Sequence, residues 1–548
     1  MSGVTLPDKA ARTIALTNID RSFLVEAGAG SGKTSIMAGR VSVLLARGKA
    51  PKNIAAITFT EFAASELRIR IDRFVNELCA GTIPPDLESA FPKEVPADQR
   101  ANLAQAKKAL DQLVCATIHG FAQALVKPYP AEAEIDPGAE IIDPAEADLA
   151  FDERYQAWLK EHLSGKDHDD IVAELVIADE AHGLALIRSI ADFQRRNRDA
   201  RPTGSAWVRD VGEHFVAAAN AFEREIGRFD FLEEQTHTAC QVFIEMAKTL
   251  GGSAMGTDRP DNQTLIGVAG IPRHLACFTQ KEERRQLKTK GAWEKAAAVA
   301  GKRKTDGSMA FDACRARYDA CHDAFETLMA TVAGELLHRI VEAIEGLLLD
   351  WGKYKRAAAL LDFDDLLYTA RDLLAKHEDV RQALAKRFQH VLVDELQDTD
   401  PLQIEILWRL CGEAPKNGNT QPLARVPRAG ALFLVGDPKQ AIYRFRGADV
   451  NAYLAAREAI GREALLKIVA NFRSVEPILA FVNLKFEKPL ASEVGQPGFT
   501  ALAATCKAEK DVIAVAALDI AVEGAETSAD MLRDAEAERI AELVFTAK

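Results

Sequence analysis

The sequence predicts an α/β protein that is built on a buried parallel sheet and interrupted by a large helical insertion. Short apolar runs at residues 23–25, 53–60, 390–393 and 431–435 each end in a glycine-rich or polar turn. Strands that are buried on both faces of a parallel sheet have this pattern. The first run leads through its turn into a helical pattern. Residues from about 126 to 345 contain only long helical patterns and predict a separate, mostly helical domain.

Length and composition indicate a multidomain globular protein. The chain has 548 residues, whereas one hydrophobic core rarely exceeds about 250–300 residues. It is 48% hydrophobic and 27% charged, which is typical of folded chains rather than disordered ones. No run approaches the roughly 20 apolar residues of a membrane helix, and the N-terminal sequence lacks the apolar core of a signal peptide. We therefore expect a cytoplasmic protein.

Charge and cysteine content exclude few functions. The net charge of −13 gives no support for nucleic-acid binding, but the local charge distribution decides such binding. The eight cysteines are scattered and form no CxxC pair. Reduced thiols are therefore a better interpretation than a zinc or iron–sulfur site.

Residues 22–34, SFLVEAGAGSGKT, form the clearest functional motif. A strand, a glycine-rich turn, Lys-Thr and a helix together make a phosphate-binding loop, in which Lys33 reaches the β- and γ-phosphates and Thr34 ligates Mg²⁺. Ala27 departs from the GxxxxGK[ST] pattern, which has glycine there. The alternative, a turn that binds nothing, leaves the flanking strand and helix unexplained. The expected nucleotide-binding residues are Ala27, Gly28, Ala29, Gly30, Ser31, Gly32, Lys33 and Thr34.

Two further strands are expected before the insertion. Residues 53–60 predict a strand with Phe59 near its carboxyl end, where α/β sheets bind ligands. Taken alone, Phe59 is more often a core residue. Residues 79–100 are rich in proline and polar side chains and predict a surface loop. Residues 113–121 predict a third strand containing His119, a histidine that is more often structural than catalytic.

The helical insertion contains one strongly basic segment. Residues 281–304 carry nine Lys or Arg residues against three Glu residues. Such a segment is a candidate contact for a nucleic-acid backbone. A solvated helix face explains the same composition about equally well.

The second half of the phosphate site follows the insertion. Residues 390–393 predict a strand that ends in the adjacent carboxylates Asp394 and Glu395. In a phosphate-loop ATPase, Asp394 would hold Mg²⁺ and Glu395 would orient and polarise the attacking water. An acidic turn after a strand is common, but Lys33 and Thr34 require such a partner.

The next expected strand leads into a loop with two kinds of functional side chain. Residues 431–440 end in Gln440, whose amide can bond a γ-phosphate or the attacking water. Phe445 lies between Arg444 and Arg446. Aromatic and basic side chains in alternation are typical of a platform on which single-stranded nucleic acid stacks.

The last segments predict more α/β structure. Residues 465–474 predict one strand that ends in Asn-Phe-Arg, and residues 506–520 predict another. A helix is expected from Ala535 to the end.

Seven motifs in order identify a resemblance to a known family. They are AGAGSGKT, ITFTEFAASELRIRI, TIHGF, DFDDLL, VDELQDTDPLQ, LVGDPKQAIYRFRGAD and NFRS. This set resembles the UvrD/Rep-type superfamily 1 helicases, from about residue 20 to the C-terminus. The EAGAGSGKT and GDPKQAIYRFRG wording and the large helical insertion look most like the RecB/AddA branch. An alanine at position 27 is normal in this family.

The resemblance implies roles for individual residues. Gln440 would sense the γ-phosphate, Arg473 would contact it, Phe472 would stack on adenine, and Arg40 would lie near the nucleotide. Lys33, Glu395, Gln440 and Arg473 are thus the expected catalytic residues, and Thr34 and Asp394 the metal ligands. The residues implied to lie against single-stranded DNA are Phe59, His119, Phe445 and Arg446.

The resemblance also implies an architecture and an activity. A RecA-like core would comprise 1–125 and 346–450, with a DNA-contacting helical insertion at 126–345. A second, incomplete RecA-like domain would begin near 451. Such proteins use Mg²⁺ and ATP to move 3′ to 5′ along single-stranded DNA in recombinational repair. The implied partners are single-stranded or tailed duplex DNA and, as a candidate, a second helicase–nuclease subunit.

Two departures from the family pattern affect these expectations. Residues 1–26 contain no glutamine, although the family has an adenine-reading glutamine upstream of the phosphate loop. The later motifs of the second RecA-like domain, which supply a second arginine to the γ-phosphate, are absent. Such an arginine accelerates phosphoryl transfer by roughly 10³–10⁵. The chain therefore resembles the N-terminal portion of a longer protein that binds ATP and DNA but hydrolyses ATP slowly.

Three functions compete at this point. The leading one is an ATP-dependent DNA helicase or translocase. The second is a DNA-binding ATPase subunit that clamps DNA or a partner without unwinding. A small-molecule kinase with the same loop needs only a compact domain of about 200 residues, and the DELQDTD and NFRS motifs contradict it.

Overall fold

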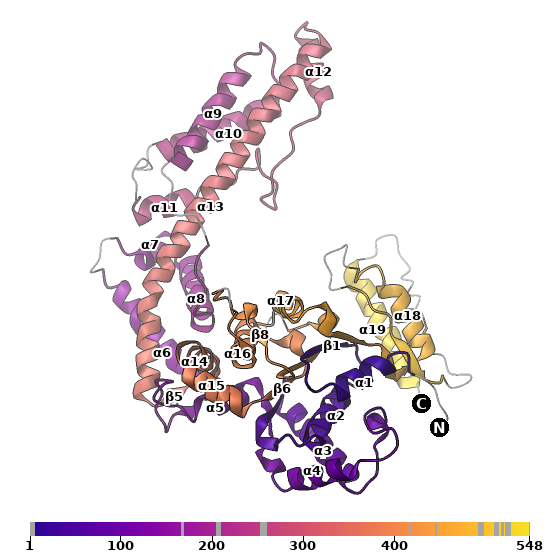
Figure 1. Cartoon of the computed structure of the whole chain (residues 1–548). Coiled ribbons are helices and arrows are strands. Elements are labelled where there is room, and N and C mark those ends of the chain that lie inside the picture. The colour runs from indigo at the N-terminus through magenta and orange to yellow at the C-terminus, as the bar shows by residue number, and fades with distance from the viewer. Residues whose placement is uncertain are drawn as a thin grey trace. The chain divides into compact units, whose positions relative to one another are not determined.

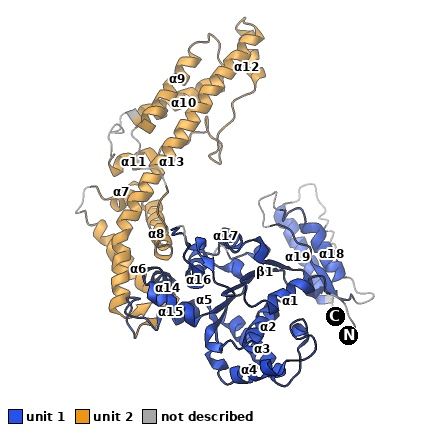
Figure 2. Ribbon diagram, in the orientation of Figure 1, with its two compact units in different colours: residues 1–137, 363–548 blue, residues 138–362 orange. Residues whose placement is uncertain are grey.

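The structure is a computed structural model that divides into two compact units (Figure 2). Unit 1 comprises residues 1–137 and 363–548, and unit 2 comprises residues 138–362. The helical unit thus begins and ends later in the chain than the expected insertion at 126–345. The residues described are 6–165, 169–203, 210–251, 260–415, 418–443, 447–491, 498–508, 514–516, 520 and 528–546.

Unit 1 is built on a six-stranded parallel sheet (Figure 1). Its strands lie in the order β10-β1-β9-β6-β2-β3, and every neighbouring pair is parallel. This confirms the predicted α/β fold class. In chain order the strands are β1 (Phe23–Ala27), β2 (Ile54–Thr58), β3 (Val114–Thr117), β6 (His390–Val393), β9 (Leu432–Gly436) and β10 (Leu465–Ile468).

Both faces of this sheet are covered by helices, because alternate residues of a strand point to opposite faces. Phe23 and Val25 of β1 join a core with the helices α1 (Lys9–Thr17), α2 (Lys33–Ala46), α3 (Glu61–Cys79) and α4 (Ala97–Lys107). Leu24, between them, is also fully buried. A second group of helices packs together, and its members α5 and α17 contact the sheet. This group is α5 (Ile118–Val126), α14 (Phe363–Lys376), α15 (Glu378–Arg387), α16 (Pro401–Cys411) and α17 (Val450–Ile460).

Two predicted segments before the insertion need correction. The third strand ends at Thr117, and His119 lies in the first turn of α5, because the Thr117 hydroxyl caps that helix by accepting the N–H of Gly120. The expected surface loop at 79–100 is folded against the core, since Leu87, Phe91 and Val95 in it are buried. Apolar side chains at irregular spacing secured this loop without a periodic pattern.

The expected strand at 465–474 is two strands in two sheets. β10 pairs with β1 in the main sheet, so this sheet extends to residue 468, past residue 451 where a second domain was expected to begin. β11 (Ala470–Val475) pairs instead with β12 (Ala503–Cys506) in a parallel two-stranded sheet. The strand predicted at 506–520 therefore lies earlier, and residues 509–513 and 517–519 lie outside the described residues. The helices α18 (Glu476–Phe486) and α19 (Ala529–Thr546) complete unit 1 with the hairpin of β7 (Gly412–Glu413) and β8 (Val426–Pro427).

Unit 2 is helical and has its own hydrophobic core. Its chain enters through β4 (Glu140–Ile141) and leaves through β5 (Leu360–Leu361), and these short strands pair in parallel. Neither the 54-residue α13 nor any other helix in the described ranges is long and apolar enough to cross a membrane. The helices are α6 (Pro144–His162), α7 (Ile171–Ala178), α8 (Glu180–Arg196), α9 (Asp210–Ile226), α10 (Glu234–Gly251), α11 (Asn262–Ala269), α12 (Lys290–Val299) and α13 (Lys304–Ala357).

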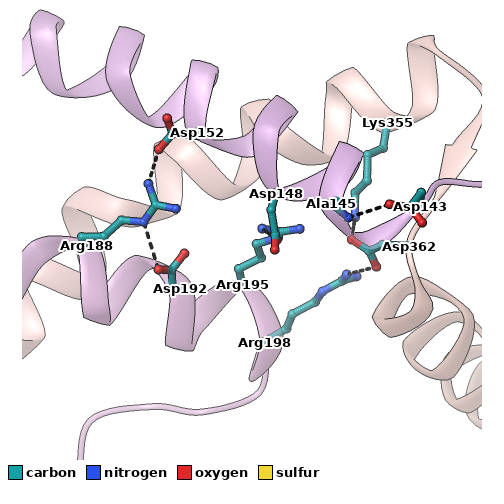
Figure 3. A network of polar contacts seen from close by, with 10 residues as sticks. All are labelled: Asp143, Ala145, Asp148, Asp152, Arg188, Asp192, Arg195, Arg198, Lys355 and Asp362. Atoms are coloured by element: carbon teal, nitrogen blue, oxygen red, sulfur yellow. Dashed lines mark hydrogen bonds and ion pairs between the residues drawn. The ribbon is translucent and has the colours of Figure 1, made fainter.

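A network of charged residues joins the base of unit 2 (Figure 3). Asp362 accepts a hydrogen bond of 2.6 Å from Lys355 and lies 3.5 Å from Arg198. Arg195 pairs with Asp148 at 2.8 Å. The Trp351 ring has the Lys355 ammonium 5.0 Å and the Arg195 guanidinium 5.2 Å from its centre. These charges are therefore paired and packed on an aromatic ring.

Much of the basic segment 281–304 is paired within unit 2. Lys288 pairs with Glu233 at 3.0 Å and Lys302 pairs with Asp230 at 2.6 Å. Arg284 faces a row of acidic residues on α13, Asp319, Asp323 and Glu326. This pairing favours the structural explanation of the segment over contacts with nucleic-acid phosphates.

Candidate nucleotide and nucleic-acid site

The predicted functional residues of unit 1 gather at the carboxyl edge of its parallel sheet. The phosphate loop follows β1, Asp394 and Glu395 follow β6, and Gln440 follows β9, which lies between those two strands. Phe59 follows β2, at the far side of β6. This edge is where open α/β sheets bind ligands, because loops from neighbouring parallel strands converge there.

The phosphate loop has the backbone shape of an anion site. Gly30 and Gly32 have φ angles of 71° and 84°, and α2 begins at the next residue, Lys33. Such left-handed residues turn successive N–H groups toward one side, and glycine adopts them without strain. Ala27 is the last residue of β1 and does not have a positive φ. An extended position needs no glycine, which explains why alanine fits there.

Lys33 and Glu395 form an ion pair across the edge between β1 and β6. Glu395 has a φ of 51°, a left-handed conformation that is strained for a residue with a Cβ atom. Gln397 holds its carboxylate with a hydrogen bond of 2.8 Å. A strained, ion-paired carboxylate beside a phosphate loop is typical of a functional site.

The acidic residues at this edge exceed the cations available to them. Burial and the neighbouring Glu395 raise the pKa of Asp394 to about 7 and that of Asp398 to about 6, and Lys33 is the cation that opposes both shifts. One carboxylate oxygen of Asp398 is buried without a hydrogen-bond partner among the described residues. These carboxylates fit a hard divalent cation, for which Asp394 and the Thr34 hydroxyl are the donors that the sequence indicates.

A chain of hydrogen bonds connects Glu395 with Gln440. Gln397 donates to Glu395 and accepts the backbone N–H of Asp437 at 2.9 Å. Asp437 in turn accepts from the Gln440 amide at 2.8 Å. Sequence reasoning missed Gln397 and Asp437, although each lies in a polar turn directly after a buried strand.

The NFRS segment lies against the phosphate loop. The Phe472 side chain is 47% exposed, which leaves ring surface for a nucleobase. Arg473 is exposed, and its Cβ would lie 2.6 Å from a Cβ at Gly30. Arg12 of α1 lies 5.0 Å from the Phe472 ring centre. Sequence reasoning missed Arg12, whose signal was an Asp–Arg pair at helical spacing, Asp8 and Arg12.

Arg40 does not lie at this edge. It is 1% exposed, two helical turns beyond Lys33, and donates to the backbone carbonyls of Ala15 at 2.6 Å and Arg21 at 3.0 Å. Burial lowers its pKa to about 9. The sequence implied a residue near the nucleotide, whereas Arg40 anchors the N-terminal segment to the core, because its side chain points to the base of the sheet.

An aromatic pair lies beyond the nucleotide residues. Phe59 stacks on Tyr443, with ring centres 5.1 Å apart and planes inclined by 26°. His119 makes an edge contact with Phe363 at 5.1 Å, and burial lowers its pKa. Sequence reasoning missed Tyr443, although it is an aromatic residue in the same loop as Phe445. Phe445 and Arg446 lie outside the described residues.

Comparison with known proteins gives the class of this protein. The family model described as the UvrD/REP helicase N-terminal domain matches residues 8–460. The chain therefore belongs to the UvrD/REP helicase family, and its sheet is the RecA-like core of that family.

The curated relatives identify the branch. The chain is 26% identical over 533 residues to the AddA subunit of the ATP-dependent helicase/nuclease of Levilactobacillus brevis, covering 89% of this chain and 39% of the relative. It is 26% identical to the protein of the same name from Pediococcus pentosaceus, covering 88% and 39%. For that of Lactococcus lactis the identity is 24%, covering 88% and 40%. These names confirm the predicted RecB/AddA-like branch, and the chain spans about two fifths of the length of these relatives.

Proposed function

We propose that this chain is the motor portion of an ATP-dependent DNA helicase or translocase that moves 3′ to 5′ along single-stranded DNA in recombinational repair. The loop after β9 carries the proposal. Gln440 in this loop is bonded into the nucleotide residues, and Tyr443, three residues later, stacks on Phe59. One short loop thus joins a candidate site of ATP hydrolysis to a candidate platform for DNA bases.

The nucleotide half supplies the parts of a phosphoryl-transfer site. Binding of ATP would exchange the Glu395 partner of Lys33 for the β- and γ-phosphates, which frees Glu395 to orient the attacking water and accept its proton. Thr34 and Asp394 would hold Mg²⁺, which neutralises charge on the phosphates. Gln440 and Arg473 would bond the γ-phosphate. The Gln397 bond would keep the Glu395 carboxylate in place throughout.

The aromatic half supplies a sequence-tolerant contact for single-stranded DNA. Stacking of a base on an aromatic ring is worth about 1–3 kcal/mol and does not depend on which base is present. Phe59 and Tyr443 come from loops after β2 and β9, with Asp394 and Glu395 after β6 between them. A shift of the β9 loop on hydrolysis would therefore alter the stack and move the strand.

The experiment that tests this proposal is steady-state ATP hydrolysis with and without single-stranded DNA, with Glu395→Gln as the control. Turnover that rises with DNA and disappears in the variant supports a motor. Binding of ATP and DNA with negligible turnover supports the alternative, an ATPase subunit that clamps DNA without unwinding it. Failure to bind either ligand contradicts both.

Polarity and partners are separate parts of the proposal. Displacement of streptavidin from a 3′ or a 5′ biotinylated end reports the direction of movement, and faster displacement from the 5′ end is expected for 3′-to-5′ movement. The relatives are named as subunits of a helicase/nuclease. We therefore expect the full-length protein to copurify with a second helicase–nuclease subunit.

A further inference from the structure

Three successive carbonyl groups of the phosphate loop accept hydrogen bonds from outside the loop. The carbonyl of Ala29 accepts from the Asn471 side-chain amide at 2.6 Å. The carbonyl of Gly30 accepts from the backbone N–H of Phe472 at 2.8 Å. The carbonyl of Ser31 accepts from the guanidinium of Arg12 at 2.9 Å. We call these three donors the clasp.

The clasp fixes which way the peptide planes of the loop face. In a trans peptide, the carbonyl of one residue and the N–H of the next point in opposite directions. Carbonyls 29 to 31 are held by the clasp, so the N–H groups of Gly30 and Gly32 face the opposite side, where a phosphate would lie. Neither N–H has a hydrogen-bond partner among the described residues. They are therefore free donors in a fixed orientation.

Each part of the clasp is itself held. The Arg12 guanidinium is paired with the buried Asp8 at 2.8 Å, and Asp8 also accepts the N–H groups of Val469 and Ala470 at 2.8 Å each. Asn471 is 3% exposed. Its side-chain oxygen accepts the N–H groups of the two residues after Phe472, at 2.9 and 2.7 Å. The clasp is a rigid structure rather than a chance contact.

The clasp also joins the two sheets of unit 1. Asn471 and Phe472 lie at the start of β11, directly after the chain leaves the main sheet. The backbone carbonyl of Asn471 accepts from Thr505 of β12 at 2.7 Å. The fit is tight enough to require glycine, since a Cβ at Gly30 would lie 2.9 Å from the Asn471 amide.

We propose that Asn471 and Arg12 are positioning residues for the nucleotide. They preorganise the phosphate loop and transmit its occupancy to the β11–β12 sheet. This inference rests on the proposed function, because it assumes that the loop binds a nucleoside triphosphate. Preorganised donors bind more tightly because less conformational freedom is lost on binding. Loss of the clasp therefore weakens nucleotide binding without removing any group that touches the nucleotide.

The sharpest variant is Asn471→Asp. It keeps the oxygen that accepts from residues 473 and 474, but it replaces the amide donor to Ala29 with a second acceptor. Asn102→Asp is the matched control, because the Asn102 amide donates to the carbonyl of Ala46, at the other end of α2, at 3.0 Å. Arg12→Lys is a second variant, which keeps the charge beside Asp8 but cannot make the same set of bonds.

The measurements are the Kd for a fluorescent ADP analogue with Mg²⁺, the Kd for single-stranded DNA without nucleotide, and hydrogen exchange with and without ADP. We expect Asn471→Asp and Arg12→Lys to weaken ADP binding by about tenfold or more, with DNA binding unchanged. We expect ADP to slow exchange in β11 of the wild type but much less in Asn471→Asp. Asn102→Asp should behave like the wild type.

The outcomes separate the two proposals. Wild-type ADP affinity in both clasp variants overturns the clasp but leaves the proposed function standing. A wild-type chain that binds no ADP overturns the proposed function and the clasp together. Should Asn471→Asp fail to fold, Arg12→Lys alone decides, and an unchanged Kd in that variant counts against the inference.

Discussion

The charged residues at the sheet edge of unit 1 and those at the base of unit 2 have opposite environments. At the sheet edge, Asp394 and Asp398 are buried with raised pKa values beside one lysine, Lys33. At the base of unit 2, Lys355 and Asp362 are paired with each other at 2.6 Å (Figure 3). One region keeps excess charge and the other balances it.

The difference separates ligand sites from structural networks. Burying a charge without a partner costs free energy, so a fold that keeps such charges needs something else to compensate them. A bound cation and phosphates would do so at the sheet edge. The paired charges of unit 2 need no ligand, because aromatic rings and counter-ions already surround them. Four variants test this distinction.

The largest effect is expected from Lys33→Ala. Removal of this ammonium loses charge-assisted bonds to the phosphates worth about 3 kcal/mol, which weakens nucleotide binding about 100-fold. Lys355→Ala is the matched control, since it removes a lysine of similar burial that is also paired with a carboxylate. It should leave the nucleotide Kd unchanged. Equal losses in titrations of both variants would remove the distinction.

Trp351→Ala should have a large effect on stability and none on binding. Trp351 is 3% exposed and lies among Phe151, Lys355 and Arg195. Truncation of such a side chain costs about 3–5 kcal/mol. Hydrogen exchange should become faster in unit 2, while exchange in the main sheet of unit 1 and the nucleotide Kd stay as in the wild type. Weaker nucleotide binding would show that unit 2 contributes to the site.

Acid should destabilise unit 2 through His322. Burial lowers the pKa of His322 to about 4 in the folded state, from about 6.5 when unfolded. Between these values the unfolded chain binds the extra proton, so stability falls as the pH falls below about 6.5. The loss at pH 5 is about 2 kcal/mol. In His322→Gln, hydrogen exchange in unit 2 should depend less on pH, and an unchanged dependence would refute this assignment.

Asp398→Asn should stabilise unit 1 slightly. The pKa of Asp398 is raised to about 6 in the folded state, so the folded chain binds more protons between pH 4 and 6, and stability falls as the pH rises through this window. The variant removes this loss and should gain about 1 kcal/mol above pH 6. Exchange rates of the main sheet at pH 4 and pH 8 measure the gain. A gain that is equal at both values would point to another cause.

Local sequence was sufficient for much of the site. The phosphate loop, Asp394 with Glu395, and Gln440 each follow a short apolar strand, and parallel strands bring their carboxyl ends to one edge. Arg12, Gln397 and Tyr443 could not be found in this way. Arg12 contacts Ser31 and Phe472, which lie 19 and 460 residues further along the chain. Nothing in its local pattern shows such partners.

The sequence by itself determined the fold class, the order of the strands along the chain and the motifs that follow them. Those properties depend on hydrophobic periodicity and turn chemistry, which act over a few residues. Only the tertiary structure decided that Arg40 is an anchor, that residues 465–474 divide between two sheets, and that Asn471 and Arg12 hold the phosphate loop. The apolar run through Ile468 and Ala470 has no local break. Its division arises because β1 offers a free edge to β10 and β12 offers one to β11.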